Sequence, residues 1–163
     1  MNKMFFTQAE ITSPWKDFQS MYVLGGDLLV QLDNGAFLPI REHSTDGGLD
    51  IKSPIDCYIQ PGDSAAIDTG VHVQLPPNTT GEVVCKSGLN VNHGLICSGL
   101  VDEGYTGSIV VKLYNLGKEP YYIKAGDKIA QLVIRPVLYL TPAQVDKIEG
   151  GERGDNGFGS TGR

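Results

Sequence analysis

The chain has 163 residues, of which 40% are hydrophobic, a size and composition typical of one compact domain. Its 13 lysines and arginines are outnumbered by 19 aspartates and glutamates, and the net charge of −6 argues against broad binding to the phosphate backbone of DNA or RNA. No apolar run approaches the roughly 18 residues of a membrane-spanning helix, and the N-terminus lacks a signal-peptide core. We therefore expect a cytoplasmic protein without a nucleic-acid or membrane partner.

Three cysteines, Cys57, Cys85 and Cys97, are spaced irregularly and form no CxxC pair. An odd number of cysteines without that spacing is typical of free thiols in a reducing compartment. A zinc site built from Cys85, His93 and Cys97 is the alternative, although its spacing is irregular for zinc.

The first 24 residues form an N-terminal extension. Ser13-Pro14 places a capping hydroxyl before a proline suited to the first helical position, which predicts a short helix. Four large apolar residues between Ile11 and Tyr22 share one face of this helix. Such a face either covers a core, which we favour, or docks a partner, so the role of the extension stays open.

Residues 27–137 read as short strands separated by Gly, Pro and Asn, with almost no period of 3.6. Residues 71–75 alternate apolar and polar side chains and stop at Pro76-Pro77-Asn78, the pattern of a half-buried strand that ends in a turn. Further strands are predicted at 109–114 and 128–137. Regular strands without intervening helices favour an all-β sandwich or jelly roll over a βαβ fold.

Two short segments early in this region have possible chemical roles. Residues 45–51, TDGGLDI, place two carboxylates around a double glycine and by themselves predict a turn. Residues 82–84 form an apolar strand that leads into Cys85-Lys86-Ser87-Gly88-Leu89, where a helical turn is expected to begin at Ser87. Free N–H groups and the helix dipole favour an anion at such a junction, so it is a candidate phosphate site. A capped turn with a solvated Lys86 is the alternative.

Two polar residues interrupt apolar strands. Residues 99–107, GLVDEGYTG, predict a β-hairpin, and Asp102 sits where one of its strands should continue. A carboxylate in that place either turns to water or lies in a cleft, where it polarises a nucleophile. Gln131 lies on the same predicted face as Ile129 and Val133, where a buried amide needs a dedicated hydrogen-bond partner.

The C-terminal region begins with Thr141-Pro142, which predicts a second short helix in the same way as the first. Residues 150–163 are rich in glycine and contain a single large apolar side chain, Phe158, so we expect a mobile arm. Within it, residues 154–161, GDNGFGST, have the glycine spacing of a phosphate loop, but the Lys, the preceding strand and the following helix of a Walker A motif are missing. The arm still offers backbone N–H groups, hydroxyls and Arg153 to an anion, and an aromatic ring to a planar base.

The order of these segments is more specific than any one of them. Along the chain stand Asp-Gly-Gly-Leu-Asp, Lys-Ser-Gly-Leu, Gly-Leu-Val-Asp-Glu-Gly-Tyr, Gly-Asp-Lys-Ile-Ala-Gln-Leu and Arg-Gly-x-x-Gly-Phe-Gly-Ser-Thr-Gly. This series resembles the five ordered motifs of the trimeric dUTPases and leaves only the first 24 residues or so outside the match. Lys86 stands where the family usually has Arg, which keeps the charge but loses the planar fork. Gly47 replaces a usual Ala, and Leu49 a usual aromatic residue.

The resemblance implies an all-β jelly roll with few short helices, assembled as a homotrimer whose three active sites lie at subunit interfaces. It implies three regions: an extension at 1–24, a β domain at 25–149, and an arm at 150–163 that closes a neighbour's active site. The implied activity is Mg2+-dependent hydrolysis of dUTP to dUMP and pyrophosphate by attack of water on the α-phosphorus. Such an enzyme limits uracil in DNA and supplies dUMP.

The resemblance also implies roles for individual residues. Asp102 activates the water, Gln131 contacts the α-phosphate region, and Asp50 supports the metal through water, so we expect no direct protein ligand to Mg2+. Tyr105 packs under the deoxyribose and rejects a 2′-hydroxyl. The other residues implied to bind the phosphates or the uracil base are Lys86, Ser87, Gly88, Gly99, Arg153, Phe158, Gly159, Ser160 and Thr161.

Two alternatives remain at this point. One is a dCTP deaminase, which shares the fold, but aligning its catalytic glutamate through Gly107 places Lys112 at that position. The other is a non-enzymatic nucleotide sensor or partner-binding homologue that uses the N-terminal segment for docking. The presence of Asp102, Tyr105, Gln131 and a complete fifth motif argues against the second alternative.

Overall fold

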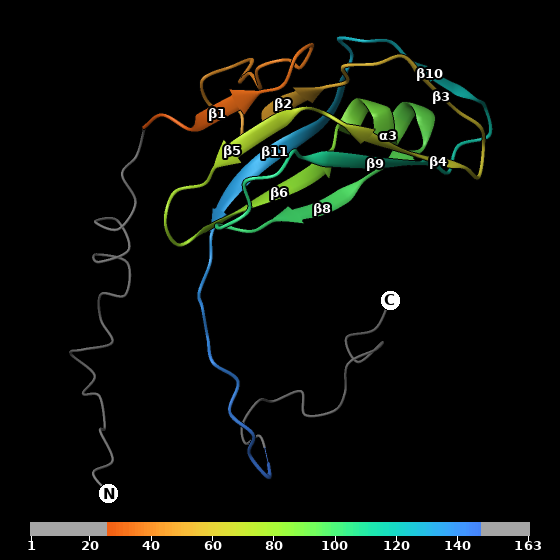
Figure 1. Ribbon diagram of the computed structural model, residues 1–163. Coiled ribbons are helices and arrows are strands. Elements are labelled where there is room, and N and C mark those ends of the chain that lie inside the picture. Colours follow the sequence, from red (N-terminus) through yellow and green to blue (C-terminus); the bar gives the residue numbers. More distant parts are fainter. Residues whose placement is uncertain (1–25, 148–163) are drawn as a thin grey trace, which may run out of the picture.

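A computed structural model describes residues 26–147 (Figure 1). The predicted N-terminal helix and the predicted C-terminal arm lie outside these residues. Within them the chain is almost entirely β, with one short helix, and no helix is long and apolar enough to cross a membrane. The elements are β1 (Leu29–Leu32), β2 (Leu49–Lys52), β3 (Cys57–Ile59), β4 (Ser64–Asp68), β5 (Val71–Gln74), β6 (Thr79–Cys85), α3 (Ser87–His93), β7 (Leu95–Ile96), β8 (Ser98–Val101), β9 (Val110–Asn115), β10 (Tyr121–Ile123) and β11 (Lys128–Pro136).

The strands form two larger sheets and two strand pairs, all antiparallel. The larger sheets have the orders β2-β11-β6-β8 and β4-β9-β7, and the pairs are β1-β5 and β10-β3. Both larger sheets contribute side chains to one apolar core, so they pack against each other. Its members include Ile51, Val83, Ile129 and Leu132 from the first sheet and Ile67, Val111 and Leu113 from the second. The predicted all-β, jelly-roll type of fold is confirmed.

Alternation of apolar and polar residues explains the strands that the sequence predicts best. In β5, Val71 and Val73 are buried whereas Gln74 is exposed, and in β9 every second residue from Val111 is buried. The last of these in β9 is Asn115, whose amide group donates to the carbonyls of Ile59 and Glu119, each at 2.9 Å. The buried amide is therefore paired and costs little to bury.

The hairpin predicted over residues 99–107 is wrong. β8 pairs with β6, whereas β9 pairs with β4 and β7 in the other sheet, so the residues between β8 and β9 cross from one sheet to the other. Ile109 ends this crossing by exchanging backbone hydrogen bonds with Thr69 and Val71. The sequence pattern of two apolar strands around a polar loop is the same for a hairpin and for a crossing between sheets, which is why it misled the prediction.

The second predicted helix is also wrong in the part of the chain that the structure describes. Residues 141–147 contain no helix. Val145, which would supply the apolar face, is 56% exposed. A capping signal lowers the cost of starting a helix, but a short helix without a face to bury is marginal in water.

Candidate active site

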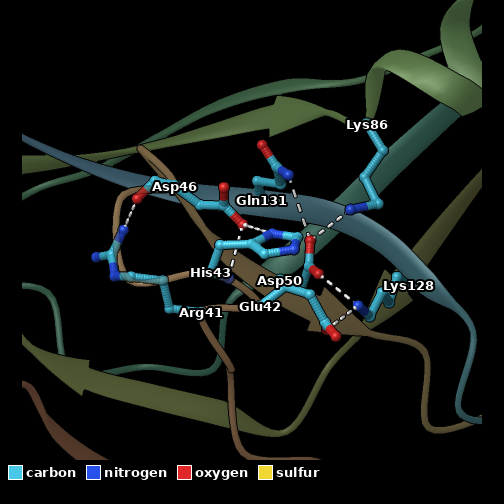
Figure 2. Close-up of polar contacts among 8 residues, drawn as sticks. All are labelled: Arg41, Glu42, His43, Asp46, Asp50, Lys86, Lys128 and Gln131. Carbon is cyan, nitrogen blue, oxygen red and sulfur yellow. Dashed lines mark hydrogen bonds and ion pairs between the residues drawn. The ribbon is translucent and has the colours of Figure 1, made fainter.

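Pairing of three strands brings three of the predicted site residues together. Asp50 on β2 lies opposite Gln131 on β11, and Gln131 lies opposite Val84 on β6, two residues before Lys86. Figure 2 shows the side chains of Asp50, Gln131 and Lys86 pointing toward one another. Positions separated by up to 81 residues in the chain thus form one polar cluster.

The carboxylate of Asp50 is the centre of this cluster, and its side chain is only 6% exposed. Its Oδ1 lies 2.5 Å from the Nζ of Lys86 and accepts a hydrogen bond of 3.3 Å from the Nε2 of Gln131. Its Oδ2 lies 2.9 Å from the Nζ of Lys128, which in turn lies 2.6 Å from Oε2 of Glu42 (Figure 2). Both carboxylate oxygens of Asp50 are therefore occupied by cationic or amide donors.

Lys128 and Glu42 were not predicted as site residues. Lys128 stands in the quoted Gly-Asp-Lys segment, but its contact with Asp50 depends on an irregular register of β11 between Lys128 and Ala130. The same irregularity makes half of the prediction for Gln131 wrong, because Ile129 does not share its face, whereas Val133 does: a Cβ at Gly48 would meet both Gln131 and Val133. Ile129, Ala130 and Leu132 are all buried in the core, whereas Gln131 lies on the other face with its amide directed at Asp50.

Gly48 leaves space for Gln131. A Cβ at Gly48 would lie 3.0 Å from the Cβ and 3.2 Å from the Oε1 of Gln131, whereas a Cβ at Gly47 would meet nothing within 4 Å. The turn in this region lies before the double glycine, at residues 43–46, where the backbone N–H of Asp46 donates to the carbonyl of His43 at 2.9 Å, and Gly47 and Gly48 form a bend that leads into β2. The two adjacent glycines thus differ in their surroundings: a side chain at Gly48 would meet Gln131, and one at Gly47 would point into open space.

The charges around Asp50 keep it ionised. Burial raises the pKa of this carboxyl, but the hydrogen bonds from Lys86, Lys128 and Gln131 and the charge of Lys86 outweigh burial, and the pKa lies below its ordinary value. Bonds to Glu42 and Asp50 in turn raise the pKa of Lys128. Asp50 and Lys128 consequently stay charged at neutral pH.

The candidate phosphate site lies at the start of α3, directly after Lys86. The predicted helical turn at Ser87 is confirmed, and no side chain caps the helix N-terminus. A Cβ at Gly88 would meet nothing within 4 Å, so Gly88 borders open space in which a ligand can approach the backbone. Gly94 ends the helix with a left-handed φ of 69°, and a Cβ there would lie 2.7 Å from the backbone N of Gly117. This close approach fixes where α3 ends.

The zinc interpretation finds no support between residues 26 and 147, where no group of three potential ligands is placed to hold a metal ion. All three cysteines are free. Burial raises the pKa of the Cys97 thiol to about 12, so the thiol is protonated at neutral pH. The imidazole of His93 instead lies against the ring of Tyr121, with 4.7 Å between the ring centroids.

Asp102 and Tyr105 lie on the crossing that follows β8. Both are exposed, and the N–H of Tyr105 donates to the backbone O of Asp102 at 3.0 Å, which closes a turn. The hydroxyl of Tyr105 donates to the carbonyl of Ser108 at 2.9 Å. The ring lies over Gly107, where a Cβ would be 2.5 Å from the tyrosine hydroxyl. Gly107 thus allows the position of Tyr105.

A single chain does not bring Asp102 to the Asp50 cluster. Val101 pairs with Gly81 near the beginning of β6, whereas Lys86 follows the last residue of β6. At about 3.3 Å per residue, the strand from Gly81 to Lys86 spans roughly 17 Å. In Figure 1 the arrow of β8 accordingly runs away from α3. Gly99, which pairs with Val83, lies between the two ends.

The predicted arm residues Arg153, Phe158, Gly159, Ser160 and Thr161 lie outside the described part of the chain. Lys112, the residue that argued against deamination, stands on β9 with its Nζ 5.0 Å from the centre of the Tyr114 ring. An ammonium group held over an aromatic ring does not replace a catalytic carboxylate.

Comparison with known proteins identifies the family. The sequence profile of the dUTPase family matches residues 35–162. A deoxyuridine 5'-triphosphate nucleotidohydrolase from Clostridium kluyveri is 44% identical over 138 residues, which cover 83% of this chain and 96% of the relative. The chain belongs to the dUTPase family. The mouse protein of the same name is 37% identical over 135 residues, which cover 82% of this chain and 83% of the mouse protein.

Solved structures of family members agree with the fold. The dUTPase of Staphylococcus bacteriophage 80alpha, solved with dUpNHpp, has a TM-score of 0.76 and 31% identity, covering 85% of this chain and 100% of its own. A point mutant of the dUTPase of phage phi11 of S. aureus, whose structure reveals the coordination of a structural Mg(II) ion, has a TM-score of 0.70 and 29% identity, covering 77% of this chain and 100% of its own.

The charged cluster predicts how acid affects the stability of this dUTPase-family chain. Because the folded protein lowers the pKa of Asp50, the ionised carboxylate stabilises the fold above its ordinary pKa, and this contribution is lost as the pH falls through the lower, folded value. Asp50→Asn cannot titrate. Its deficit in free energy of unfolding, measured by urea denaturation, should be largest above about pH 5 and shrink below about pH 4.

The exposed Asp63→Asn serves as the control, for which we expect little change at any pH. A deficit of Asp50→Asn that stayed constant from neutral to acid pH would show that Asp50 makes no stabilising ion pair.

Proposed function

We propose that this chain hydrolyses dUTP to dUMP and pyrophosphate, with water attacking the α-phosphorus. The observation that carries the proposal is the division of the family's motifs between two ends of β6. The proposed phosphate-binding end carries Lys86, Ser87, Asp50 and Gln131, and the other end carries the exposed acid Asp102. The names of the relatives and the dUpNHpp bound by the bacteriophage enzyme support the choice of nucleotide.

At the phosphate-binding end, the backbone of Ser87 and Gly88 and the ammonium group of Lys86 bind the phosphates. The ammonium group of Lys86 is paired with the carboxylate of Asp50, and the Lys86 side chain is only 25% exposed. The ammonium group is therefore partly desolvated and held in one orientation before the nucleotide binds. Gln131 contacts the α-phosphate region with the amide group that Asp50 holds in place. Lys86 supplies a point charge where most of the family has the bidentate fork of Arg, so phosphate affinity here depends more on charge than on geometry.

The residues of the cluster fit a Mg2+ ion that arrives with the triphosphate. Asp50 is the acid of the first motif, but its two oxygens are occupied by Lys86, Lys128 and Gln131, so it does not offer a free ligand position. Mg2+ is commonly held by substrate phosphates and water with little help from protein carboxylates. When bound, it neutralises the phosphate charges that otherwise repel water and Asp102. Asp50 would meet the water shell of the ion only through the lone pairs that Lys86, Lys128 and Gln131 leave free.

At the other end, Asp102 accepts a proton from the attacking water and orients it toward the α-phosphorus. Tyr105 packs under the deoxyribose, where its ring leaves no space for a 2′-hydroxyl. The backbone around Gly99 reads the uracil base and excludes the methyl group of thymine. These two contacts select the sugar and the base, while the cluster around Asp50 selects only the phosphates.

The distance along β6 supports a site that is shared between chains. We propose a homotrimer in which Asp102 of one subunit faces the Asp50 cluster of a neighbour. The arm of residues 150–163 closes the site, with Arg153, Ser160 and Thr161 on the γ-phosphate, Phe158 stacked on the base, and Gly159 allowing close approach of the backbone. Closure excludes bulk water and strengthens each of these contacts.

Removal of the general base tests the chemistry. Asp102→Asn should still bind nucleotide but lose hydrolysis of dUTP by at least about a hundredfold, because general bases contribute roughly that much or more. Pyrophosphate release should be measured with dUTP, dTTP, dCTP and UTP, with and without Mg2+. We expect release from dUTP alone, and only with the metal. Undiminished turnover by Asp102→Asn would remove Asp102 from this role, and release of ammonia from dCTP would indicate a deaminase.

A mixing experiment tests the sharing of sites. Asp102→Asn and a chain lacking residues 150–163 should each be nearly inactive alone. If a site takes Asp102 and the arm from different subunits, co-refolding equal amounts should restore about a quarter of the sites. Failure of the mixture to regain activity, although both chains exchange into common oligomers, would contradict the proposed arrangement.

A further inference from the structure

The side chain of Glu103, next to Asp102, joins three separate segments of the chain. Its Oε2 accepts a hydrogen bond of 2.9 Å from the backbone N–H of Asn78 and one of 2.6 Å from the hydroxyl of Tyr139. Asn78 lies in the turn between β5 and β6, and Tyr139 follows the end of β11. One carboxylate oxygen therefore connects the crossing after β8 to two neighbouring segments.

The segment that carries Tyr139 is also attached to the same turn. The backbone N–H of Val137 donates to the carbonyl of Asn78 at 2.9 Å. Asn78 has a positive φ of 58°, a left-handed conformation that asparagine tolerates better than most residues other than glycine. Its N–H donates to Glu103 and its carbonyl accepts from Val137, so both backbone groups of the turn are paired.

Tyr139 lies within electrostatic reach of Asp102 itself. The pKa of its phenol is raised, chiefly by the hydrogen bond to Glu103 and then by burial and the charges of Glu103 and Asp102. The phenol thus remains a hydrogen-bond donor at neutral pH. In contrast, no described residue donates a side-chain hydrogen bond to the carboxylate of Asp102. The direction of Asp102 therefore depends on the backbone next to it, which Glu103 holds.

We propose that Glu103 and Tyr139 are positioning residues for dUTP hydrolysis: their hydrogen bond fixes the backbone that aims Asp102. The inference rests on the proposed role of Asp102 as the base. An acid that must orient water toward a neighbouring subunit's nucleotide needs a rigid support, and a small displacement of the base costs rate without weakening substrate binding. The bond also ties the start of the C-terminal segment to the loop that carries the base.

The test uses Tyr139→Phe, which removes the hydroxyl and keeps the ring. We expect kcat for dUTP to fall about three- to tenfold while KM stays within about twofold, because the hydroxyl orients the base and does not touch the nucleotide. Tyr122→Phe is the matched control, since Tyr122 on β10 donates a comparable bond of 2.7 Å to Asp56, the residue before β3. We expect this control to retain the wild-type kcat.

A double-variant cycle and hydrogen exchange complete the test. Glu103→Ala should lower kcat at least as much as Tyr139→Phe, and the double variant should be no slower than Glu103→Ala alone. Amide exchange in residues 102–105 should become faster in Tyr139→Phe and stay unchanged in Tyr122→Phe.

An unchanged kcat in Tyr139→Phe, equal losses in both tyrosine variants, or multiplying effects in the double variant would overturn the inference. Unchanged exchange in residues 102–105 would also overturn it. If the wild type failed to hydrolyse dUTP, the proposed function would be wrong instead, and exchange would still decide whether Tyr139 holds this loop.

Discussion

The pairing of one nearly buried carboxylate with two lysines is the interaction on which the site depends. A buried charge is tolerated only when it is paired and hydrogen-bonded, and Asp50 meets this condition through Lys86, Lys128 and Gln131. These partners come from the end of β6 and from β11, so the cluster forms only when β2, β11 and β6 pair in their observed register. The fold thereby places Lys86 directly before α3, with its ammonium group held by Asp50.

The length of β6 separates the residues proposed to bind the phosphates from the acid proposed to activate water. Its last residue leads into the proposed phosphate-binding turn, while its beginning pairs with the strand that leads to Asp102. The separation keeps the acid away from its own chain's lysines, with which it would otherwise form an ion pair. We infer that the acid meets the nucleotide only across a subunit boundary, which makes activity a property of the assembled protein.

The sequence predicts the strands and the family well, because both rest on local patterns. Alternation in β5 and β9 reflects burial of every second residue, and the motif order needs no knowledge of the fold. Contacts between distant segments are different. Lys128 reaches Asp50 through a register irregularity, and Tyr139 reaches Glu103 across the end of a sheet, and neither leaves a pattern in the sequence. The hairpin predicted around Asp102 was wrong for the same reason: which strands pair depends on contacts between distant segments, and the local sequence does not record them.

The proposed site depends on Gln131, which Asp50 holds and which is seated against Gly48, contacting the α-phosphate of the nucleotide beside Lys86. This contact is tested most directly by isothermal titration of the non-hydrolysable analogue dUpNHpp into the wild type, Gly48→Ala and Gly47→Ala. A methyl group at position 48 meets Gln131 at 3.0 Å, whereas one at position 47 meets nothing within 4 Å. We predict that Gly48→Ala binds about tenfold more weakly, as expected for loss of a hydrogen bond to a charged group, and that Gly47→Ala binds like the wild type. Equal affinity of all three proteins would contradict the account.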